Sequence, residues 1–378
     1  MSFTSTVPVE KIIKHLRELV SREDSTESAC YAAEVLKKAG FDTVLQDVPP
    51  GKFNGGKFNV MASAGGGEKC LLWFGHTDVV PAGDRSLWQS DPFELTERDR
   101  KLYGRGSCDM KGPIACLLAL AEEKAGTWDK LPFCLSIVLD TAEETDNVGV
   151  LKYLEAPLHA DAAIVGEPSV MEVCTSHRGV THLRTTINGK KYHASEAPTA
   201  LNANLFAAHF MVNCEKIIRG IRPEGRGSVG ITMVRGGDAK NTIPESCEVI
   251  LDVRLVGRET FQDAINAVKE KLEETGKAMP GFTWSVERMT YSPAHESREG
   301  ALISKALQIT EEVTGQKQQE SIFSATCEAG YIADSVNGPT IVWGPGSLAQ
   351  AHVVNEFISL EQLEYGYRCY QALLEQGI

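Results

Sequence analysis

The stretch KCLLWFGHTD, residues 69–78, decides the fold class of this chain. Its apolar run is short and nearly continuous, which is typical of a strand buried on both faces of a parallel sheet. The run ends in His76, and Asp78 follows two residues later. Because ligands of such sheets bind at the carboxyl ends of the strands, these two side chains are candidates for chemistry.

Three further apolar runs have the same character. They are FCLSIVLDTAEE (133–144), AAIVGEP (162–168) and PTIVWGPG (339–346). Between the first and second runs of the chain, residues 108–126 repeat apolar positions at helical spacing, and Pro113 suits a first helical turn. Residues 9–40 are also helical in pattern and end at a glycine stop signal. We therefore predict an α/β domain with a mostly parallel sheet and helices on both faces.

The middle of the chain has a different pattern. From Thr175 to Tyr291 the predicted order is strand, helix, strand, strand, helix, strand, which is a self-contained, open-faced α+β unit of the ferredoxin-like type. The α/β pattern then resumes. We predict that residues 1–174 and 292–378 form one domain and that residues 175–291 are inserted into it, since 378 residues usually make two domains.

Composition narrows the class of protein. The chain has 38 basic and 51 acidic side chains, a net charge of −13, and no basic cluster among aromatics, so we expect no nucleic-acid partner. No apolar stretch reaches the roughly 18 to 20 residues of a membrane span, and no signal segment opens the chain, so we expect a cytoplasmic protein with no membrane partner. The ten cysteines are scattered singly, which indicates reduced side chains. The expected partner is a small molecule.

Polar groups at the strand ends and in the loops form one candidate set. It consists of His76, Asp78, Asp109, Glu143, Glu144, Glu167 and His352. So many carboxylates at one sheet edge would repel one another unless a metal supplied positive charge. Oxygen and imidazole ligands without thiolate suit zinc, cobalt or manganese. Singly, a strand-end carboxylate is more often solvated or a helix cap, and the repetition at four runs is what favours a metal.

These residues occur in motifs that resemble a known family. The motifs are GHTD (75–78), YGRG (103–106), CDMKG (108–112), EE (143–144), GEP (166–168) and GPG (344–346), followed by His352. In this order they are similar to the acetylornithine deacetylase, succinyl-diaminopimelate desuccinylase and aminoacylase family of dimetal hydrolases. The resemblance covers nearly the whole chain, including the insertion, and implies a zinc-exopeptidase-like α/β domain.

The resemblance also implies two divalent metal ions, with zinc expected first and cobalt or manganese as alternatives. The implied ligands are His76, Asp109 and Glu167 for one ion, and Asp109, Glu144 and His352 for the other. Asp109 would bridge the ions, and the carboxylate of Asp78 would fix the tautomer of a ligating imidazole. Glu143 would be the general base, although a role in neutralising charge alone is the simpler alternative.

Within the insertion, the resemblance implies a site residue and a substrate clamp. His193, in GKKYHAS (189–195), would polarise the scissile carbonyl across a dimer interface, although Tyr192 stands where glycine is common and an exposed turn histidine is the alternative. Asn241 and Arg254 would bind substrate, and a guanidinium suits an α-carboxylate unless it is used in a structural salt bridge. The glycines of the late GPG motif, Gly344 and Gly346, are further expected substrate contacts.

The expected reaction is metal-assisted hydrolysis of the amide of an N-acyl-L-amino acid. Acetylornithine deacetylases are the most similar subfamily, which implies conversion of N2-acetyl-L-ornithine to L-ornithine and acetate in arginine biosynthesis. Glu328, in Cys327-Glu328-Ala329, would bind the ornithine ammonium, with Cys327 in place of a threonine. The alternatives are a desuccinylase, another N-acyl-amino-acid deacylase, a dipeptidase or carboxypeptidase, and a non-catalytic amino-acid-binding relative. The free side of the inserted sheet also predicts a homodimer through this domain.

Overall fold

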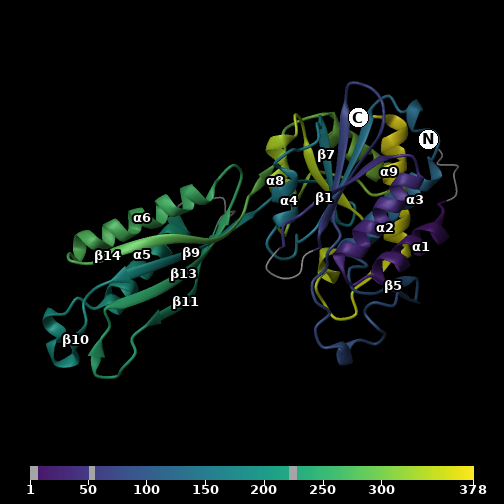
Figure 1. Ribbon diagram of the computed structural model, residues 1–378. Coiled ribbons are helices and arrows are strands. Elements are labelled where there is room, and N and C mark those ends of the chain that lie inside the picture. Colours follow the sequence, from purple (N-terminus) through teal and green to yellow (C-terminus); the bar gives the residue numbers. More distant parts are fainter. Residues whose placement is uncertain (1–6, 51–55, 221–227) are drawn as a thin grey trace. The chain divides into compact units, whose positions relative to one another are not determined.

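The computed structural model describes residues 7–50, 56–220 and 228–378 and divides the chain into two compact units (Figure 1). Unit 1 contains Met1–Ser176, Ser297–Phe323 and Cys327–Ile378, and unit 2 contains His177–Glu296 and Ser324–Thr326. Unit 2 therefore begins and ends slightly later than the insertion at 175–291 expected from the sequence. Each unit has its own hydrophobic core.

The core of unit 1 is a sheet in which the four apolar runs are the parallel strands. These strands are β6 (Cys134–Asp140), β3 (Cys70–His76), β7 (Ala162–Pro168) and β17 (Thr340–Gly344), side by side in that order. The antiparallel strands β1 (Asp42–Asp47) and β2 (Phe58–Gly65) flank them on one side. On the other side β8 (Cys174–His177) runs antiparallel to β17 and has β15 (His295–Glu296) and β16 (Ser321–Phe323) as its other neighbours. The predicted α/β class is confirmed, and β1 and β2 are additions that the sequence patterns did not predict.

Helices cover both faces of this sheet, as Figure 1 shows. One layer contains α1 (Val9–Val20), α2 (Ser25–Lys38), α3 (Lys111–Glu123), α7 (Ala301–Thr314) and α9 (Leu360–Gln376), and the other contains α4 (Val148–Tyr153) and α8 (Ala329–Ile332). Successive side chains of β3 pack against opposite helical layers. Trp73 belongs to the large hydrophobic core, whereas the centre of the Phe74 ring lies 5.3 Å from that of Tyr153 in α4. Such two-sided burial is why the run has no polar alternation.

The helical pattern at residues 9–40 forms two helices rather than one. The break falls before α2, where the Asp24 side chain accepts a hydrogen bond from the backbone N–H of Thr26 and so caps the second helix. A small sheet, β18 (Phe357–Ser359), β5 (Lys101–Tyr103) and β4 (Thr96–Arg98), completes unit 1. All ten cysteines are free. Across the described residues, no helix is both long enough and apolar enough to cross a membrane.

Unit 2 has the predicted order of elements. They are β9 (Gly179–Asn188), α5 (Ala203–Gly220), β11 (Ser228–Gly236), β13 (Ser246–Leu255), α6 (Phe261–Ala278) and β14 (Thr283–Ser292), with a short pair formed by β10 (Tyr192–His193) and β12 (Thr242–Ile243). The sheet order is β11-β13-β9-β14, and every pairing is antiparallel. Alternate residues of β9 are buried in the core that includes α5 and α6.

The free face of this sheet, opposite α5 and α6, is charged rather than apolar. Arg184 pairs with Glu248 at 2.9 Å and with Glu287 at 3.2 Å, and Asp252 lies 3.2 Å from His182. These groups bind one another across neighbouring strands. The free face therefore has no need of an apolar cover, and the expectation of a dimer cannot rest on such a need.

His177 makes the stability of the protein depend on pH. Its imidazole is 2 % exposed, and burial lowers its pKa to about 4, against about 6.5 in an unfolded chain. The unfolded chain therefore binds more protons between these values, so stability is complete above pH 6.5 and is lost as the pH falls toward 4. We expect His177 to contribute about 2 kcal/mol to the fall in the free energy of unfolding between pH 7 and pH 5, measured with denaturant as the difference between the wild type and a variant without this imidazole.

His177→Gln removes the titrating group and should remove this dependence. The control is His209→Gln, on the exposed side of α5, which should leave the wild-type slope unchanged. An identical slope in the wild type and in His177→Gln would show that another group causes the loss.

Candidate metal centre

The parallel strands of unit 1 bring most of the predicted site residues to one edge of the sheet. His76 ends β3 directly beside Asp140, which ends β6, and Glu167 stands one residue before the end of β7. Glu143 and Glu144 follow β6 by three and four residues. Because parallel strands end at the same edge, residues that are far apart in the sequence meet there.

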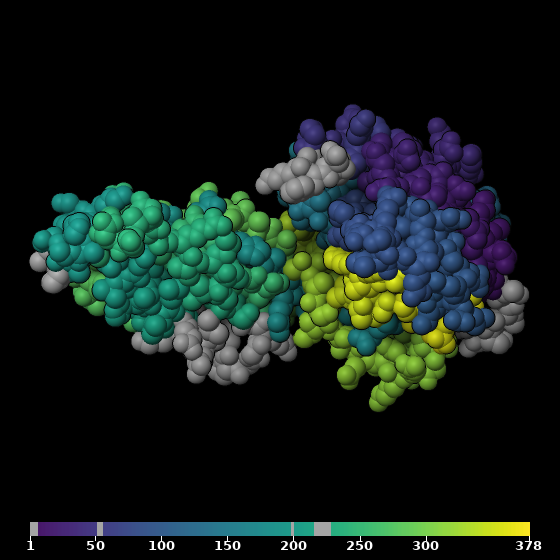
Figure 2. Space-filling view, turned by 90° about the horizontal axis from the view of Figure 1, so that it is seen from below, coloured from purple at the N-terminus to yellow at the C-terminus, as the bar shows by residue number. Residues whose placement is uncertain are grey.

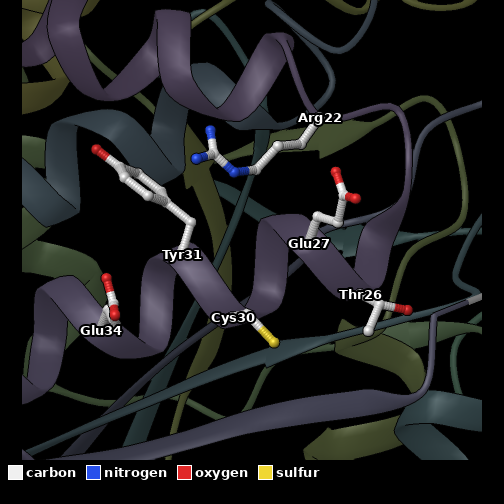
Figure 3. Close-up of a pocket in the computed structure, with 6 residues that line it drawn as sticks. All are labelled: Arg22, Thr26, Glu27, Cys30, Tyr31 and Glu34. Atoms are coloured by element: carbon white, nitrogen blue, oxygen red, sulfur yellow. The ribbon is translucent and has the colours of Figure 1, made fainter.

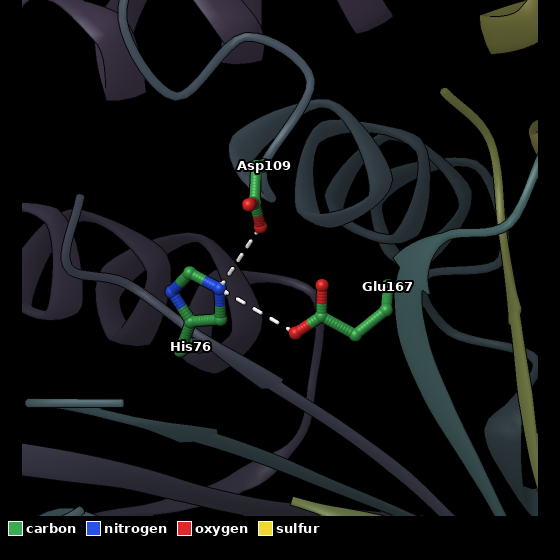
Figure 4. A group of neighbouring side chains, drawn as sticks. All are labelled: His76, Asp109 and Glu167. Carbon is green, nitrogen blue, oxygen red and sulfur yellow. Dashed lines mark hydrogen bonds and ion pairs between the residues drawn. The ribbon is translucent and has the colours of Figure 1, made fainter. Parts of the chain in front are cut away.

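Four groups of three potential metal ligands occur among the described residues, and two of these triads share Asp109. His76, Asp109 and Glu167 form the first of these two (Figure 4). The Nε2 atom of His76 lies 3.3 Å from Oδ1 of Asp109 and 3.5 Å from Oε1 of Glu167. All three residues are at most 6 % exposed. Figure 4 shows the two carboxylates converging on the same ring nitrogen.

Asp109, Glu144 and His352 form the second triad. Nε2 of His352 lies 3.3 Å from Oδ2 of Asp109 and 3.0 Å from Oε1 of Glu144. The two oxygens of Asp109 therefore face different histidines, as a bridging carboxylate would. Two ligand atoms that each lie at a zinc bond length from a tetrahedral ion are about 3.3 Å from each other. The nitrogen–oxygen distances in both triads are close to this value.

The raised pKa values of the two histidines indicate that the carboxylates of this cluster need positive charge beside them. Hydrogen bonds with Asp109 and Glu144 raise the pKa of His352 to about 10. Burial lowers the pKa of His76, but hydrogen bonding with Asp109 and the charge of Glu167 outweigh it and hold that pKa well above its usual value. Protons on the two imidazoles therefore supply the charge, and divalent ions bound to deprotonated imidazoles would replace them. The donor set, imidazole and carboxylate without thiolate, suits zinc-like ions.

Asp78 lies where predicted but makes different contacts. Nδ1 of His76 is 3.0 Å from the backbone carbonyl of Asp78 and 3.6 Å from its carboxylate. The two carboxylate oxygens accept hydrogen bonds from the backbone N–H groups of Glu143, at 3.2 Å, and Glu144, at 3.1 Å. The Asp78 backbone therefore orients the imidazole, while its side chain fixes the turn that carries both glutamates.

Glu143 adjoins two other carboxylates, those of Glu167 and Glu328. Burial, followed by the charge of Glu328, raises the pKa of Glu143 well above its usual value. Glu328 is 0 % exposed, and its carboxylate interacts with the equally buried side chain of Asp140. Asp140, which ends β6, is also fully buried, and burial with the charge of Glu328 raises its pKa. These buried carboxylates, those of Glu143, Glu328 and Asp140, also fit a cation bound beside them.

Sequence reasoning missed several polar residues that are buried near this centre. They are Asp140, Arg105, Lys111 and Glu356. Asp140 ends an apolar run just as His76 does, so the same signal could have found it. Glu356 gives no such signal, because its partners are backbone groups 247 to 250 residues earlier in the chain.

Gly344 and Gly346 have packing reasons for being glycine. A Cβ at Gly344 would stand 2.1 Å from the carbonyl oxygen of Gly166 in β7, and one at Gly346 would stand 2.8 Å from the sulfur of Cys108. Gly346 also has a φ of +101°, which side chains rarely adopt. These glycines therefore let the strand-end loops approach closely.

The predicted site residues of unit 2 fall into two places. Pairing of β10 with β12 sets His193 opposite Thr242, and the carbonyl of Asn241 accepts a hydrogen bond from the N–H of Ala194. His193 is exposed, and its Nδ1 is 3.0 Å from the Ser195 hydroxyl. Arg254 stands near the other end of the sheet, where its guanidinium donates two hydrogen bonds to the carboxylate of Asp252.

A surface pocket elsewhere in unit 1 contains none of the predicted site residues (Figure 3). It is lined by Arg22, Thr26, Glu27, Cys30, Tyr31 and Glu34. The Arg22 guanidinium lies 4.6 Å from the centre of the Tyr31 ring. No triad of metal-ligating atoms found in the described residues includes a member of this pocket, so the strand-end cluster is the candidate site.

Comparison with known proteins identifies the family. The sequence model of peptidase family M20/M25/M40 matches residues 72–376. The chain belongs to this family. Acetylornithine deacetylase from Photorhabdus laumondii is 33 % identical to this M20 family member over 353 residues, covering 90 % of the chain and 88 % of the relative. Acetylornithine deacetylase from Klebsiella pneumoniae is 33 % identical over 336 residues, covering 85 % and 83 %.

Solved structures show the same fold for this M20 family member. Aminopeptidase PepT from Bacillus cereus aligns with a TM-score of 0.82 at 18 % identity, covering 98 % of this chain and 99 % of that one. The Bacillus subtilis YxeP protein, a dinuclear metal-binding M20 peptidase, aligns with a TM-score of 0.72 at 17 % identity and 97 % coverage of each chain. The predictions of the family, the fold class and a hydrolase of this family are confirmed.

Proposed function

We propose that this M20 hydrolase removes the acyl group from an N-acyl-L-amino acid and that N2-acetyl-L-ornithine is its preferred substrate. The observation that carries the proposal is the pair of triads that share Asp109. His76 and Glu167 would complete the site of one divalent ion, and Glu144 and His352 that of the other, with zinc expected first and cobalt or manganese as alternatives. When bound, the ions supply Lewis acidity to the scissile carbonyl and lower the pKa of the attacking water.

Glu143 is the proposed general base. It adjoins the first triad through Glu167, and its raised pKa suits a group that must both take and release a proton. Its carboxylate takes a proton as the water oxygen bonds to the carbonyl carbon. It then delivers that proton to the amide nitrogen as the carbon–nitrogen bond breaks, which leaves a carboxylate and a free amine. Asp78 holds the backbone of Glu143 in place for both transfers.

The substrate assignment rests on the two acetylornithine deacetylases, each 33 % identical to the chain. We propose that Glu328 binds the side-chain ammonium of the substrate, because it is a fully buried carboxylate grouped with the acidic side chains of Glu143 and Glu167. Arg254 is proposed to bind the α-carboxylate. Its present partner, Asp252, would have to yield one or both hydrogen bonds to the substrate.

A panel of substrates tests this proposal. It contains acetylornithine, acetylcitrulline, acetylmethionine, succinyl-diaminopimelate and dipeptides, and we expect acetylornithine to have the highest kcat/KM. We expect Glu328→Gln to lower kcat/KM by about 10²-fold for acetylornithine and by much less for acetylmethionine, which has no ammonium to lose its partner. An equal loss on both substrates would place Glu328 in support of Glu143 instead. A preference for dipeptides would replace the deacylase proposal with a peptidase.

Unit 2 supports a site shared between two chains. Arg254 pairs with Val180 near the start of β9, whereas His193 lies beyond the other end of that strand. Eight residues of strand, from Val180 to Asn188, span about 27 Å. One small substrate could not touch both side chains of a single sheet, so if both act on it, they come from different chains. β11 is also an edge strand with exposed Met233 and Val234, which could pair with a second copy.

Mixing two inactive variants tests the shared site. His193→Ala and Glu143→Ala chains, each nearly inactive alone, should recover up to about a quarter of wild-type activity after subunit exchange, since half the dimers are mixed and each has one intact site. The control mixture, Glu143→Ala with Glu144→Ala, should recover nothing because both changes lie at the metal centre. No recovery from the first mixture, despite proven exchange, would reject the cross-subunit role of His193.

A further inference from the structure

Asp109 takes part in both triads, yet no strand of the central sheet contains it. It lies in the turn at residues 104–109 between β5 and α3. His352, its partner in the second triad, lies in another loop, before β18. His76 and Glu167, by contrast, are held within β3 and β7. The spacing of Asp109 and His352 must therefore be set by contacts between their loops.

Glu356 makes the contacts that fix this turn. Its side chain is 1 % exposed. Oε1 accepts hydrogen bonds from the backbone N–H groups of Cys108, at 2.9 Å, and Asp109, at 3.1 Å. Oε2 accepts from the N–H of Gly106, at 3.0 Å, and from Nη1 of Arg105, at 2.6 Å. A carboxylate has about four acceptor positions, so this turn engages the whole group.

Arg105, in the same turn, forms a buried ion pair with Glu356. Its side chain is 3 % exposed, its Nη2 also donates to the carbonyl of Pro81 at 3.4 Å, and its guanidinium lies 5.3 Å from the Trp88 ring. A buried carboxylate without a cation would be costly. The ion pair therefore offsets part of the cost of burying Glu356 and fixes its position.

Glu356 also belongs to the segment that carries His352, only four residues before it. The carbonyl of Glu356 accepts a hydrogen bond from the N–H of Gly104, and β18 then pairs with β5. Figure 2 shows blue residues around position 100 beside yellow residues of the C-terminal part on the surface of unit 1. The backbone and side chain of one residue thus join the loops of two candidate metal ligands.

We propose that Glu356, held by Arg105, is a positioning residue that sets the spacing of Asp109 and His352. This inference rests on the proposed function, because it concerns the ions proposed to bind there. Glu356 joins the segments of two members of the second triad but of only one member of the first. Its loss should therefore weaken the second triad more than the first, whereas a general structural defect would weaken both alike.

Glu356→Gln is the variant that tests this inference. Glutamine keeps the size of the side chain, but its NH₂ group would face an N–H donor in the turn or the Arg105 guanidinium. The matched control is Glu364→Gln on α9, which changes a glutamate that pairs with Arg100. Each metal-free protein is titrated with Zn²⁺ by calorimetry and with Co²⁺ by visible absorption. We expect two binding steps in the wild type and control, and one of them weakened about 10- to 100-fold in Glu356→Gln.

Each outcome decides the inference. Two unchanged steps, or equal weakening of both, in a folded Glu356→Gln protein would overturn it. If circular dichroism shows that this variant does not fold, Arg105→Lys replaces it, since lysine keeps the charge without the planar fork. Selective weakening of one step in Arg105→Lys supports the inference, and two unchanged steps overturn it. A wild-type protein that binds no ions would reject the proposed function itself, which differs from a wild type and a variant that bind two ions alike.

Discussion

Removal of divalent metal is expected to lower the activity of this hydrolase by about 10³-fold or more. The carboxylates of the two triads carry negative charge and cannot polarise a carbonyl, so only a bound ion would supply the Lewis acidity, which is worth several kcal/mol of barrier. The measurement is turnover of acetylornithine after dialysis against a chelator, with metal content determined on the same sample. Zn²⁺ or Co²⁺ should restore turnover at about two ions per chain.

Two ligand variants are controls for this experiment. Asp109→Asn alters the residue shared by both triads and should weaken the binding of both ions, whereas Glu144→Gln should weaken only one. Full turnover in protein shown to contain no metal would reject the two-metal mechanism. Equal effects of the two variants on both ions would reject Asp109 as the bridge.

Replacement of Glu143 by alanine is expected to separate catalysis from metal binding. Since the proposed task of Glu143 is proton transfer, kcat should fall by about 10²- to 10⁴-fold while the metal content stays at the wild-type level. Burial and the charge of Glu328 raise the pKa of Glu143, which suits it to take a proton and release it again. Turnover and metal analysis of the same preparation provide the measurement.

Glu144→Ala is the matched control for Glu143→Ala, because the two residues are neighbours with the same side chain. Glu144 lies 3.0 Å from His352 in the second triad, so its loss should reduce metal content. Loss of metal from Glu143→Ala and its retention in Glu144→Ala would reverse the two assignments. Loss of metal from both would indicate that the turn held by Asp78 has collapsed.

The sequence by itself determined the α/β class and the order of elements in unit 2, because these depend on local patterns. A strand buried on both faces must be apolar throughout, so β3, β6, β7 and β17 were visible as runs. It also placed His76, Glu143, Glu144 and Glu167 at one edge of the sheet, because the polar ends of parallel strands must meet there, whereas the division into two triads was implied by the resemblance to the family. β1 and β2 escaped prediction because, on the flank of the sheet, they have mixed burial rather than a continuous apolar run.

Only the tertiary structure decided which partner each buried polar group has. The carboxylate of Asp78 bonds to the backbone of Glu143 and Glu144, and that of Glu356 to the turn before α3. Backbone N–H groups are the same at every position, so no residue pattern reveals which of them will need a buried acceptor. The charged free face of unit 2 was equally hidden, because its ion pairs join strands far apart in the sequence. Local chemistry fixes an element and its polar end, but contacts across the chain fix what that end binds.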